Sequence, residues 1–547
     1  MQERISALAW KTKLVPSSAT PNSVVEERET RFSSALRVEE RETRFPSAPP
    51  PPRPPPREPP PAQSPCGVTF KPQRASPLTV SPIPFTTMPA QGSHLSFDAV
   101  TDLVHRRGST PLWIEDDRVV TWNQFGAHVE EVRSLLQGAG VEPGEVVVTP
   151  GEAALESIVW LFAVASVGGV VAPLRPERRT HAQAWKTFLK IGWRVEEGRL
   201  VRESSGEACE RTSALLHTLR ERAHPGLILA TGGTSGTPKV VLHDLVLLGS
   251  TIPVRNAERP LRILPLLKFD HIGGLDAVWR ALAAGHCLVC PPVEFSIDAV
   301  AAAIERHTVE VLPATPSFLN LLMLGNVRQE RDLTSLRTVP YGAEPMSAAL
   351  LVRLRSSFPN VDFVERFGTS ETGALPVSST AEGLVLREAS GRFDWKVVEG
   401  ELWIKSPAQA LGYLSGGDRL FDSSGWFRTG DLAQYQGDRS IRVLGRKVEL
   451  INVGGEKVLP ASVESALLEH PCVADCRVSG SPNAVLGQVV VADLVWTGPE
   501  NDPLEVKKKL HDFVAALLPK SHLPVVVRLV GSIDSTDNLK KSRRPCL

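Results

Sequence analysis

The sequence predicts an α/β protein with two domains: a large domain of parallel-type sheets flanked by helices, and a small α+β domain. Three observations predict this class. Short β-branched runs alternate with helical stretches from about residue 95, this texture changes after about Gly445, and 547 residues with 42% hydrophobic content suffice for more than one core. We therefore expect a large domain over residues 95–444 and a small domain over residues 445–547.

The first 94 residues differ in composition from the rest. The string Val25–Phe32 recurs as Val38–Phe45, and a proline-rich run covers Pro46–Pro61. Such segments favour extended, solvated polyproline conformation and bury no core. We expect a disordered tail over residues 1–94. In the alternative interpretation Met88 is the true start, and a third interpretation makes the run a docking site for a proline-binding partner.

Hydrophobic periodicity places the elements of the large domain. Phe125–Leu136 has apolar residues near a 3.6-residue period and predicts a helix, whereas Gly144–Val148 predicts a strand. The apolar run Leu155–Leu174 contains Glu156 and two glycines, so it indicates a core helix and a strand rather than a membrane span. Further strands are expected at Leu227–Ala230, Leu261–Leu264, Cys287–Cys290, Val309–Leu312, Leu336–Val339 and Val361–Glu365.

The small domain mixes helices and strands. Glu464–Glu469 and Glu505–Leu518 predict helices, and Val489–Trp496 predicts a strand. The change of texture places the domain boundary near Leu444–Glu449.

Charge and cysteine content exclude several classes of function. The 61 basic residues balance 61 acidic ones, so no positive field for non-specific nucleic-acid binding is expected. The lone C-x-x-C at Cys287 and Cys290 has no second pair at zinc-ligand spacing, and we expect free thiols in a reducing compartment. No basic segment leads into an apolar one at the N-terminus, so we expect a cytoplasmic protein without a membrane span.

A glycine-rich segment follows the predicted strand Leu227–Ala230. It reads Thr231-Gly-Gly-Thr-Ser-Gly-Thr-Pro-Lys239. Glycines permit close backbone approach, hydroxyls donate hydrogen bonds, and a lysine offers a point charge to phosphate oxygens. The spacing fits neither a Walker loop nor a nucleophile elbow. This segment alone is compatible with a phosphate-binding loop and with an ordinary surface loop.

Four further strings follow in order. The first is Phe269-Asp-His-Ile-Gly-Gly274, the second Tyr341-Gly-Ala-Glu-Pro345, the third Phe367-Gly-Thr-Ser-Glu-Thr-Gly373 and the fourth Trp426-Phe-Arg-Thr-Gly-Asp431. A lone carboxylate such as Glu371 in a hydroxyl-rich loop suits Mg²⁺ beside phosphates, and the Asp431 carboxylate suits sugar hydroxyls. Taken alone, Glu371 is also compatible with a solvated surface residue, and Asp431 with a residue that caps a turn.

The ordered set of motifs resembles the adenylate-forming superfamily of acyl- and aryl-CoA synthetases, peptide-synthetase adenylation domains and luciferases. The resemblance covers about residues 95–547 and implies a large AMP-binding domain with a small, mobile C-terminal domain. It implies ATP-dependent activation of a carboxylic acid to acyl-AMP, then transfer to a thiol.

The resemblance assigns roles to matching residues. It implies that the ATP phosphates contact Thr231, Gly232, Gly233, Thr234, Ser235, Gly236, Thr237 and Lys239. It implies that AMP contacts Gly342, Ala343, Glu344, Phe367, Gly368, Thr369, Ser370, Asp431 and Arg446, and that Glu371 binds Mg²⁺. His271, Gly273 and Gly274 match the acyl-site segment, and Gly454 with Gly455 match a thiol channel. His271 would touch the carboxylate or gate the site, or else be a hydrogen-bonded core histidine.

The family's C-terminal lysine matches Lys540. It normally stands in T-x-x-G-K, and here Thr536-Asp-Asn-Leu-Lys540 carries Leu539 in place of the glycine. We expect Lys540 to be catalytic, with Lys541 as the alternative, or else this basic stretch is a solvated tail. Gly232, Val240, Phe367 and Val448 also depart from the family pattern, yet none of these changes removes a charged group needed for adenylation.

The resemblance implies ATP, Mg²⁺ and a small-molecule carboxylic acid as ligands. The thiol acceptor is coenzyme A or, alternatively, the pantetheine of an acyl carrier protein. A protein of another class, a catalytically inactive AMP-binding scaffold, stays open because of the altered loop residues and Leu539. The acid itself is not readable from the sequence.

Overall fold

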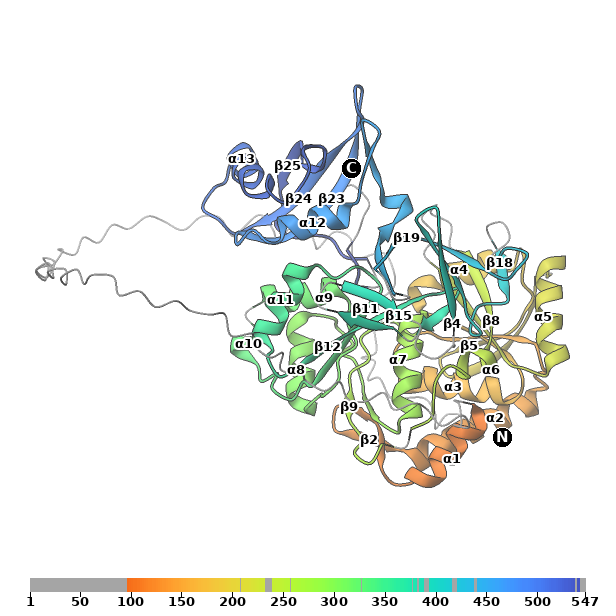
Figure 1. Cartoon of the computed structure of the whole chain (residues 1–547). Helices are drawn as coiled ribbons and strands as arrows, with labels where there is room; N and C mark the ends of the chain where they lie inside the picture. Colours follow the sequence, from red (N-terminus) through yellow and green to blue (C-terminus); the bar gives the residue numbers. More distant parts are fainter. Residues whose placement is uncertain are drawn as a thin grey trace, which may run out of the picture. The chain divides into compact units, whose positions relative to one another are not determined.

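A computed structural model describes residues 96–206, 208–231, 239–255, 257–325, 327–375, 377–380, 383–387, 393–415, 421–436, 440–536 and 539–541. The predicted tail over residues 1–94 lies outside these ranges, as do Gly232–Pro238 of the glycine-rich segment. The described residues form a mixed α/β structure, as predicted (Figure 1).

The largest sheet has seven strands in the order β18-β8-β7-β4-β3-β5-β6. Its strands are β3 (Val146–Pro150), β4 (Val170–Leu174), β5 (Ile191–Glu196), β6 (Arg199–Ser205), β7 (Gly226–Thr231), β8 (Lys239–Asp244) and β18 (Gly412–Ser415). The central strands β5, β3, β4 and β7 are parallel, and β6, β8 and β18 join antiparallel at the edges. The predicted parallel strands are therefore confirmed in this sheet.

Two smaller sheets continue the parallel part of the fold. One contains β1 (Pro111–Glu115), β2 (Arg118–Thr121), β9 (Arg262–Ile263) and β10 (Cys287–Val289). The other contains β11 (Thr338–Gly342), β12 (Asp362–Thr369) and β13 (Gly373–Leu375). The predicted strand at residues 309–312 forms only two isolated bridges, from Val311 to Ile263 and to Thr338, because Pro313 lacks the N–H that a longer ladder needs.

A six-stranded antiparallel sheet was not anticipated. It has the order β14-β15-β20-β19-β17-β16. Its strands are β14 (Ser378–Thr380), β15 (Gly383–Arg387), β16 (Asp394–Val398), β17 (Glu401–Lys405), β19 (Phe427–Tyr435) and β20 (Ser440–Arg446). This sheet carries Asp431 and Arg446, so it supplies part of the candidate site.

Residues beyond β20 build the small α+β part. Its sheet contains β21 (Ile451–Val453), β22 (Glu456–Val458), β23 (Val473–Asn483), β24 (Gly487–Trp496) and β25 (Val526–Leu529). Helices α12 (Pro460–Leu467) and α13 (Pro503–Val514) accompany it, each with proline in its first turn, where the missing N–H is not needed. The two predicted helices are confirmed, with earlier starts.

The remaining helices belong to the large part of the fold. They are α1 (Phe97–Arg107), α2 (Trp122–Ala139), α3 (Leu155–Ser166), α4 (Arg179–Trp185), α5 (Glu210–Arg222), α6 (Leu245–Gly249), α7 (Ile272–Ala283), α8 (Ile297–His307), α9 (Pro316–Leu324), α10 (Val327–Glu330) and α11 (Ala348–Ser357). A capping box between Thr121 and Gln124 starts α2, and left-handed Gly140 ends it. These local signals explain why α2 extends beyond the predicted Phe125–Leu136.

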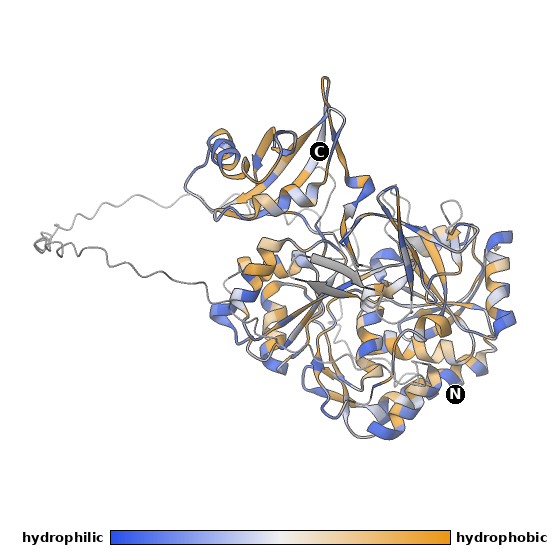
Figure 2. Ribbon diagram, viewed as in Figure 1, coloured by the Kyte–Doolittle hydropathy of each residue, from blue (hydrophilic) through white to orange (hydrophobic). Residues whose placement is uncertain are grey.

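Burial follows the hydropathy pattern. Most residues of α3 are buried, and the ribbon is hydrophobic there, whereas α5 and α13 carry many hydrophilic residues (Figure 2). In the described ranges no helix combines the length and apolarity needed to cross a bilayer. The five described cysteines are free thiols, as expected.

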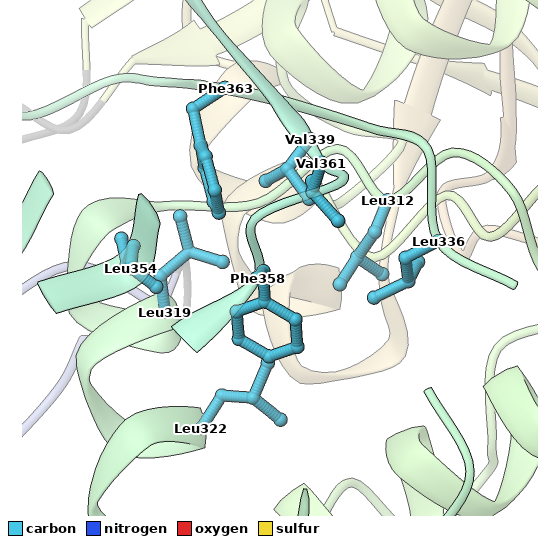
Figure 3. Close-up of a pocket in the computed structure, with 9 residues that line it drawn as sticks. All are labelled: Leu312, Leu319, Leu322, Leu336, Val339, Leu354, Phe358, Val361 and Phe363. Carbon is cyan, nitrogen blue, oxygen red and sulfur yellow. The ribbon is translucent and has the colours of Figure 1, made fainter. Parts of the chain in front are cut away.

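An apolar cavity lies in the core between α9, α11 and the β11–β12 pair (Figure 3). Its lining residues are Leu312, Leu319, Leu322, Leu336, Val339, Leu354, Phe358, Val361 and Phe363. All are aliphatic or phenyl side chains, so the cavity offers nothing that would bind phosphate or carboxylate. We interpret it as a packing gap of the core.

Candidate active site

The glycine-rich segment connects two paired strands. Thr231 ends β7, Lys239 begins β8, and these two residues face one another in the antiparallel ladder. The predicted phosphate contacts Gly232–Thr237 lie outside the described residues, as does the side chain of Thr231. Lys239 Nζ lies 5.1 Å from the ring centroid of Tyr413 on β18, a cation–π geometry that holds the ammonium at the end of the loop.

Tyr413 also links this lysine to Glu371. The Tyr413 hydroxyl donates to Glu371 Oε1 at 2.9 Å, and burial raises the pKa of Tyr413, so it remains a donor. Glu371 lies in the turn between β12 and β13, where its backbone N–H donates to Thr369 Oγ1 at 3.2 Å. Tyr413 was not predicted as a site residue, because it belongs to none of the sequence motifs.

The turn after β12 is anchored from β8. His243 Nε2 donates to the Ser370 carbonyl at 2.6 Å, and burial lowers the pKa of this histidine, which keeps it neutral. Gly368 is required by packing, because a Cβ there would lie 2.5 Å from the Gly373 carbonyl oxygen. The Phe367–Ser370 segment is therefore held rigidly beside Glu371.

The segment after β11 meets the C-terminal loop. Glu344 Oε1 accepts from Ser317 N at 2.6 Å, and its Oε2 accepts from Lys541 N at 3.1 Å. Ala343 adopts a left-handed φ of 72°, a conformation uncommon for a side chain with Cβ. Gly342 packs so closely against the backbone of Arg366 that a Cβ on Gly342 would lie 2.4 Å from the Arg366 carbonyl oxygen. This contact leaves room only for glycine.

The two C-terminal lysines differ in their surroundings. Lys541 Nζ donates to Asp475 Oδ1 at 2.9 Å and to the Cys476 carbonyl at 2.5 Å, so its ammonium is used in the small domain. Burial lowers the pKa of Lys540. The charge of Glu344 raises this pKa, and the charge of Arg446 lowers it further. Two predicted AMP-binding residues, Glu344 and Arg446, are thus the charged groups that act on Lys540, whereas Lys541 is bound by Asp475.

The loop that carries Lys540 is fixed on both sides. Thr536 N donates to the Lys540 carbonyl at 2.6 Å, and Leu539 adopts a left-handed φ of 57°, at the position where the family has glycine. The Thr315 hydroxyl, at the N-terminus of α9, donates to the Leu539 carbonyl. Leu539 therefore adopts the left-handed conformation that favours glycine.

Asp431 and Arg446 face one another across β19 and β20. Arg446 Nε lies 2.7 Å from Asp431 Oδ1, and Arg446 Nη1 donates to the Thr429 carbonyl at 3.3 Å. Asp431 is only 4% exposed, and its Oδ2 has no hydrogen-bond partner within the described ranges. Burial raises the pKa of Asp431 to about 6, against the effect of Arg446. A free, buried acceptor of this kind fits a ligand hydroxyl.

His271 belongs to a buried charged cluster that the sequence did not reveal. Asp270 Oδ2 lies 3.0 Å from Arg175 Nε and 3.3 Å from Arg178 Nη1, and its Oδ1 lies 3.7 Å from His271 Nε2. Burial lowers the pKa of His271 to about 4, so the ring is neutral at pH 7. The charge of Lys540 also lowers the pKa of His271.

The predicted thiol-channel glycines form a tight turn. Gly454 and Gly455 connect β21 to β22 with φ values of 59° and 96°, and no atom lies within 4 Å of a Cβ position at Gly455. The Gly454 N–H donates to the Leu486 carbonyl at 2.8 Å. The turn has the open backbone that the prediction requires.

Comparison with known proteins identifies the relatives of this chain. The sequence model of the family described as "AMP-binding enzyme" matches residues 100–189 and 195–414, and that of "AMP-binding enzyme C-terminal domain" matches 462–540. A probable CoA ligase from Humulus lupulus is 25% identical over 78% of this chain and 87% of the relative. An indoleacetate–CoA ligase from Aromatoleum aromaticum is 27% identical over 69% of this chain and 84% of the relative.

Solved structures share the fold. An anthranilate CoA ligase in complex with anthranoyl-AMP superimposes with a TM-score of 0.66 at 18% identity, covering 82% of this chain and 96% of that one. The o-succinylbenzoate CoA synthetase of Bacillus subtilis gives 0.61 at 23% identity, covering 81% and 96%. Both have a large N-terminal and a small C-terminal domain, and the predicted architecture is confirmed.

Proposed function

Since this chain belongs to the family of AMP-binding enzymes and is an AMP-forming acid–thiol ligase, we propose that it adenylates a carboxylic acid with ATP and transfers the acyl group to coenzyme A. The observation that carries the proposal is the position of Lys540. The charges of Glu344 and Arg446 act on Lys540, and the charge of Lys540 acts on His271, while the neighbouring Lys541 is bound by Asp475.

In the first step, one oxygen of the acid's carboxylate attacks the α-phosphorus of ATP, and pyrophosphate leaves. Lys540 offsets the negative charge that develops on the phosphate and the repulsion felt by the carboxylate. The loop from Thr231 to Lys239 orients the leaving phosphates. The segments Gly342–Glu344 and Phe367–Ser370 hold the adenosine. The Asp431 carboxylate accepts hydrogen bonds from the ribose hydroxyls, and Arg446 helps to position them.

Glu371 is the residue that would hold Mg²⁺. Among the described residues no group of three or more metal-ligating side chains comes together, which fits an ion bound by one carboxylate and the substrate phosphates. When bound, the ion neutralises phosphate charge. Tyr413 and the Thr369 hydroxyl orient Glu371 for this role.

In the second step, the thiol sulfur attacks the acyl carbonyl and AMP leaves. We place the domain boundary at residues 444–449, where β20 ends at Arg446 and Val448 is 67% exposed. Rotation at this boundary would withdraw Lys540 and bring the Gly454–Gly455 turn to the site, as in a gated reaction. His271, neutral and beside Lys540, would contact the carboxylate of the acid.

The test is a screen of carboxylic acids for acid-dependent ATP–pyrophosphate exchange, followed by thioester formation with coenzyme A and with a pantetheinylated carrier protein. We expect exchange with at least one acid and faster transfer to coenzyme A. Faster transfer to the carrier protein would identify its pantetheine, rather than coenzyme A, as the acceptor. A complete lack of exchange across the panel, with AMP still bound, would favour the inactive scaffold.

A further inference from the structure

Arg366 lies between two of the segments assigned to the nucleotide. It faces Gly342 across the parallel pair of β11 and β12, and Phe367–Thr369 follow it directly. The close packing of its backbone on Gly342 fixes its position. Ligands of α/β proteins bind at the carboxyl ends of parallel strands, and Arg366 stands near that end of β12.

Helix α7 supplies the charges beside Arg366. Asp276 and Arg280 lie one turn apart on this helix, with 2.8 Å between Oδ2 and Nε. The helix packs against β13, the strand that pairs with β12 beyond Arg366. Burial lowers the pKa of Arg366, Arg280 lowers it further and Asp276 raises it. We call Arg366, Asp276 and Arg280 the α7–β12 charge cluster.

The α7–β12 charge cluster contains two cationic side chains and only one anionic side chain. Asp276 is engaged by Arg280, whereas Arg366 makes no hydrogen bond or ion pair within the part of the chain that the structure describes. Glu365 is adjacent in sequence but lies on the opposite face of β12, since side chains alternate along a strand. Two guanidinium groups thus share one carboxylate, and a partly buried unpaired charge is costly unless a ligand pairs it.

Arg366 and Lys540 have different charged neighbours. Glu344 and Arg446 are the charged groups that act on Lys540, and Arg280 and Asp276 are those that act on Arg366. The two cations therefore have no charged neighbour in common among these groups. The reacting carboxylate belongs beside Lys540, which leaves Arg366 for a group further along the acid.

We propose that Arg366 binds a second carboxylate of the substrate, remote from the reacting one, and that the acid activated by this enzyme is a dicarboxylic acid. The inference rests on the proposed function and narrows its substrate class. A guanidinium binds a carboxylate through two parallel N–H···O bonds, and a matched monocarboxylic acid would leave the partly buried Arg366 without a partner.

The test compares matched acids in the ATP–pyrophosphate exchange assay: terephthalate with p-toluate, and adipate with hexanoate. For at least one pair we expect the diacid to exceed the monoacid in kcat/KM by about tenfold or more, the range of a charge-assisted pair. Arg366→Met should remove this preference. Asp276→Asn should strengthen it, because it adds one uncompensated positive charge. Misfolding would not change the preference for the diacid in opposite directions in Arg366→Met and Asp276→Asn.

Arg353→Met is the matched control. Arg353 on α11 is likewise a guanidinium whose pKa burial lowers, but it contacts Asn320 and lies outside the cluster, so the acid preference should persist. An unchanged preference in Arg366→Met overturns the dicarboxylate inference and leaves acid activation standing. If no acid supports exchange, the proposed function fails instead. Calorimetric binding of terephthalate to wild type and Arg366→Met, with AMP present, then decides the inference: equal affinities overturn it.

Discussion

Single residues at the site show how burial sets charge. Asp431 has a folded-state pKa of about 6, raised mainly by burial, although Arg446 lies at 2.7 Å. Its pKa in the unfolded chain is about 3.9. The folded protein therefore holds the proton more tightly, and Asp431 contributes stability at low pH that is lost as the pH rises from about 4 through about 6.

Replacing Asp431 by asparagine should remove that part of the pH dependence. We expect the free energy of unfolding of wild type to fall relative to Asp431→Asn over this pH window, by up to about 3 kcal/mol. Chemical denaturation at several pH values measures the difference. Parallel curves for the two proteins would show that Asp431 does not titrate in this range.

At the scale of elements, the first turn of α7 needs one glycine and tolerates a side chain at the position before it. A Cβ at Gly274 would lie 2.1 Å from the Lys268 carbonyl oxygen, whereas one at Gly273 meets only the end of the Leu267 side chain at 3.6 Å. The backbone contact at Gly274 holds the start of α7, and hence His271, against the preceding turn.

Alanine at these two positions should act in opposite directions. Gly274→Ala forces the backbone apart and should destabilise the protein by roughly 1 to 3 kcal/mol or more. Gly273→Ala, the matched control, should be neutral or stabilising by up to about 1 kcal/mol, because alanine favours the helix. Thermal and urea denaturation check both. Equal stability of the two variants would contradict the packing seen at Gly274.

The N-terminus of α9 is coupled to the catalytic loop. Thr315 Oγ1 accepts from Phe318 N at 3.2 Å as the helix cap, and the same hydroxyl donates to the Leu539 carbonyl next to Lys540. One side chain therefore stabilises a helix of the large domain and positions the loop of the small one.

Thr315→Ala should reduce kcat/KM for adenylation by about two- to tenfold, the value of one hydrogen bond, in addition to about 1 kcal/mol lost at the cap. Thr315→Ser keeps the hydroxyl and should restore both. Ser296→Ala removes only a cap, that of α8, and controls for the loss of stability. An equal loss of activity in Ser296→Ala would mean that the Thr315–Leu539 contact does not matter for catalysis.

At the scale of the whole molecule, sequence patterns were sufficient for some features. The parallel strands β3, β4 and β7 of the seven-stranded sheet are visible as apolar, β-branched runs, because parallel strands are buried on both faces. The antiparallel sheet was missed because strands such as β16 are partly exposed along their length and lack a continuous apolar run.

For the candidate site, too, some features could be predicted from the sequence and others could not. Asp431 and Arg446 were identified from two motifs, and the strand register explains their contact. The pairing of Arg175 with Asp270, 95 positions apart, and of Tyr413 with Glu371 depends on tertiary packing and leaves no local pattern. The different surroundings of Lys540 and Lys541 also required the structure, since the sequence places both in one basic stretch.

We predict that the small domain delivers one ammonium, that of Lys540, to the adenylation step. The most direct measurement compares Lys540→Ala with Lys541→Ala in two half-reactions: acid-dependent ATP–pyrophosphate exchange, and thioester formation from supplied acyl-AMP. We expect Lys540→Ala to lose exchange by about a hundredfold or more while it still forms thioester. Lys541→Ala should mainly lose stability, because it leaves the buried Asp475 unpaired. Equal loss of both half-reactions in Lys540→Ala, or normal exchange in that variant, would contradict this role of Lys540.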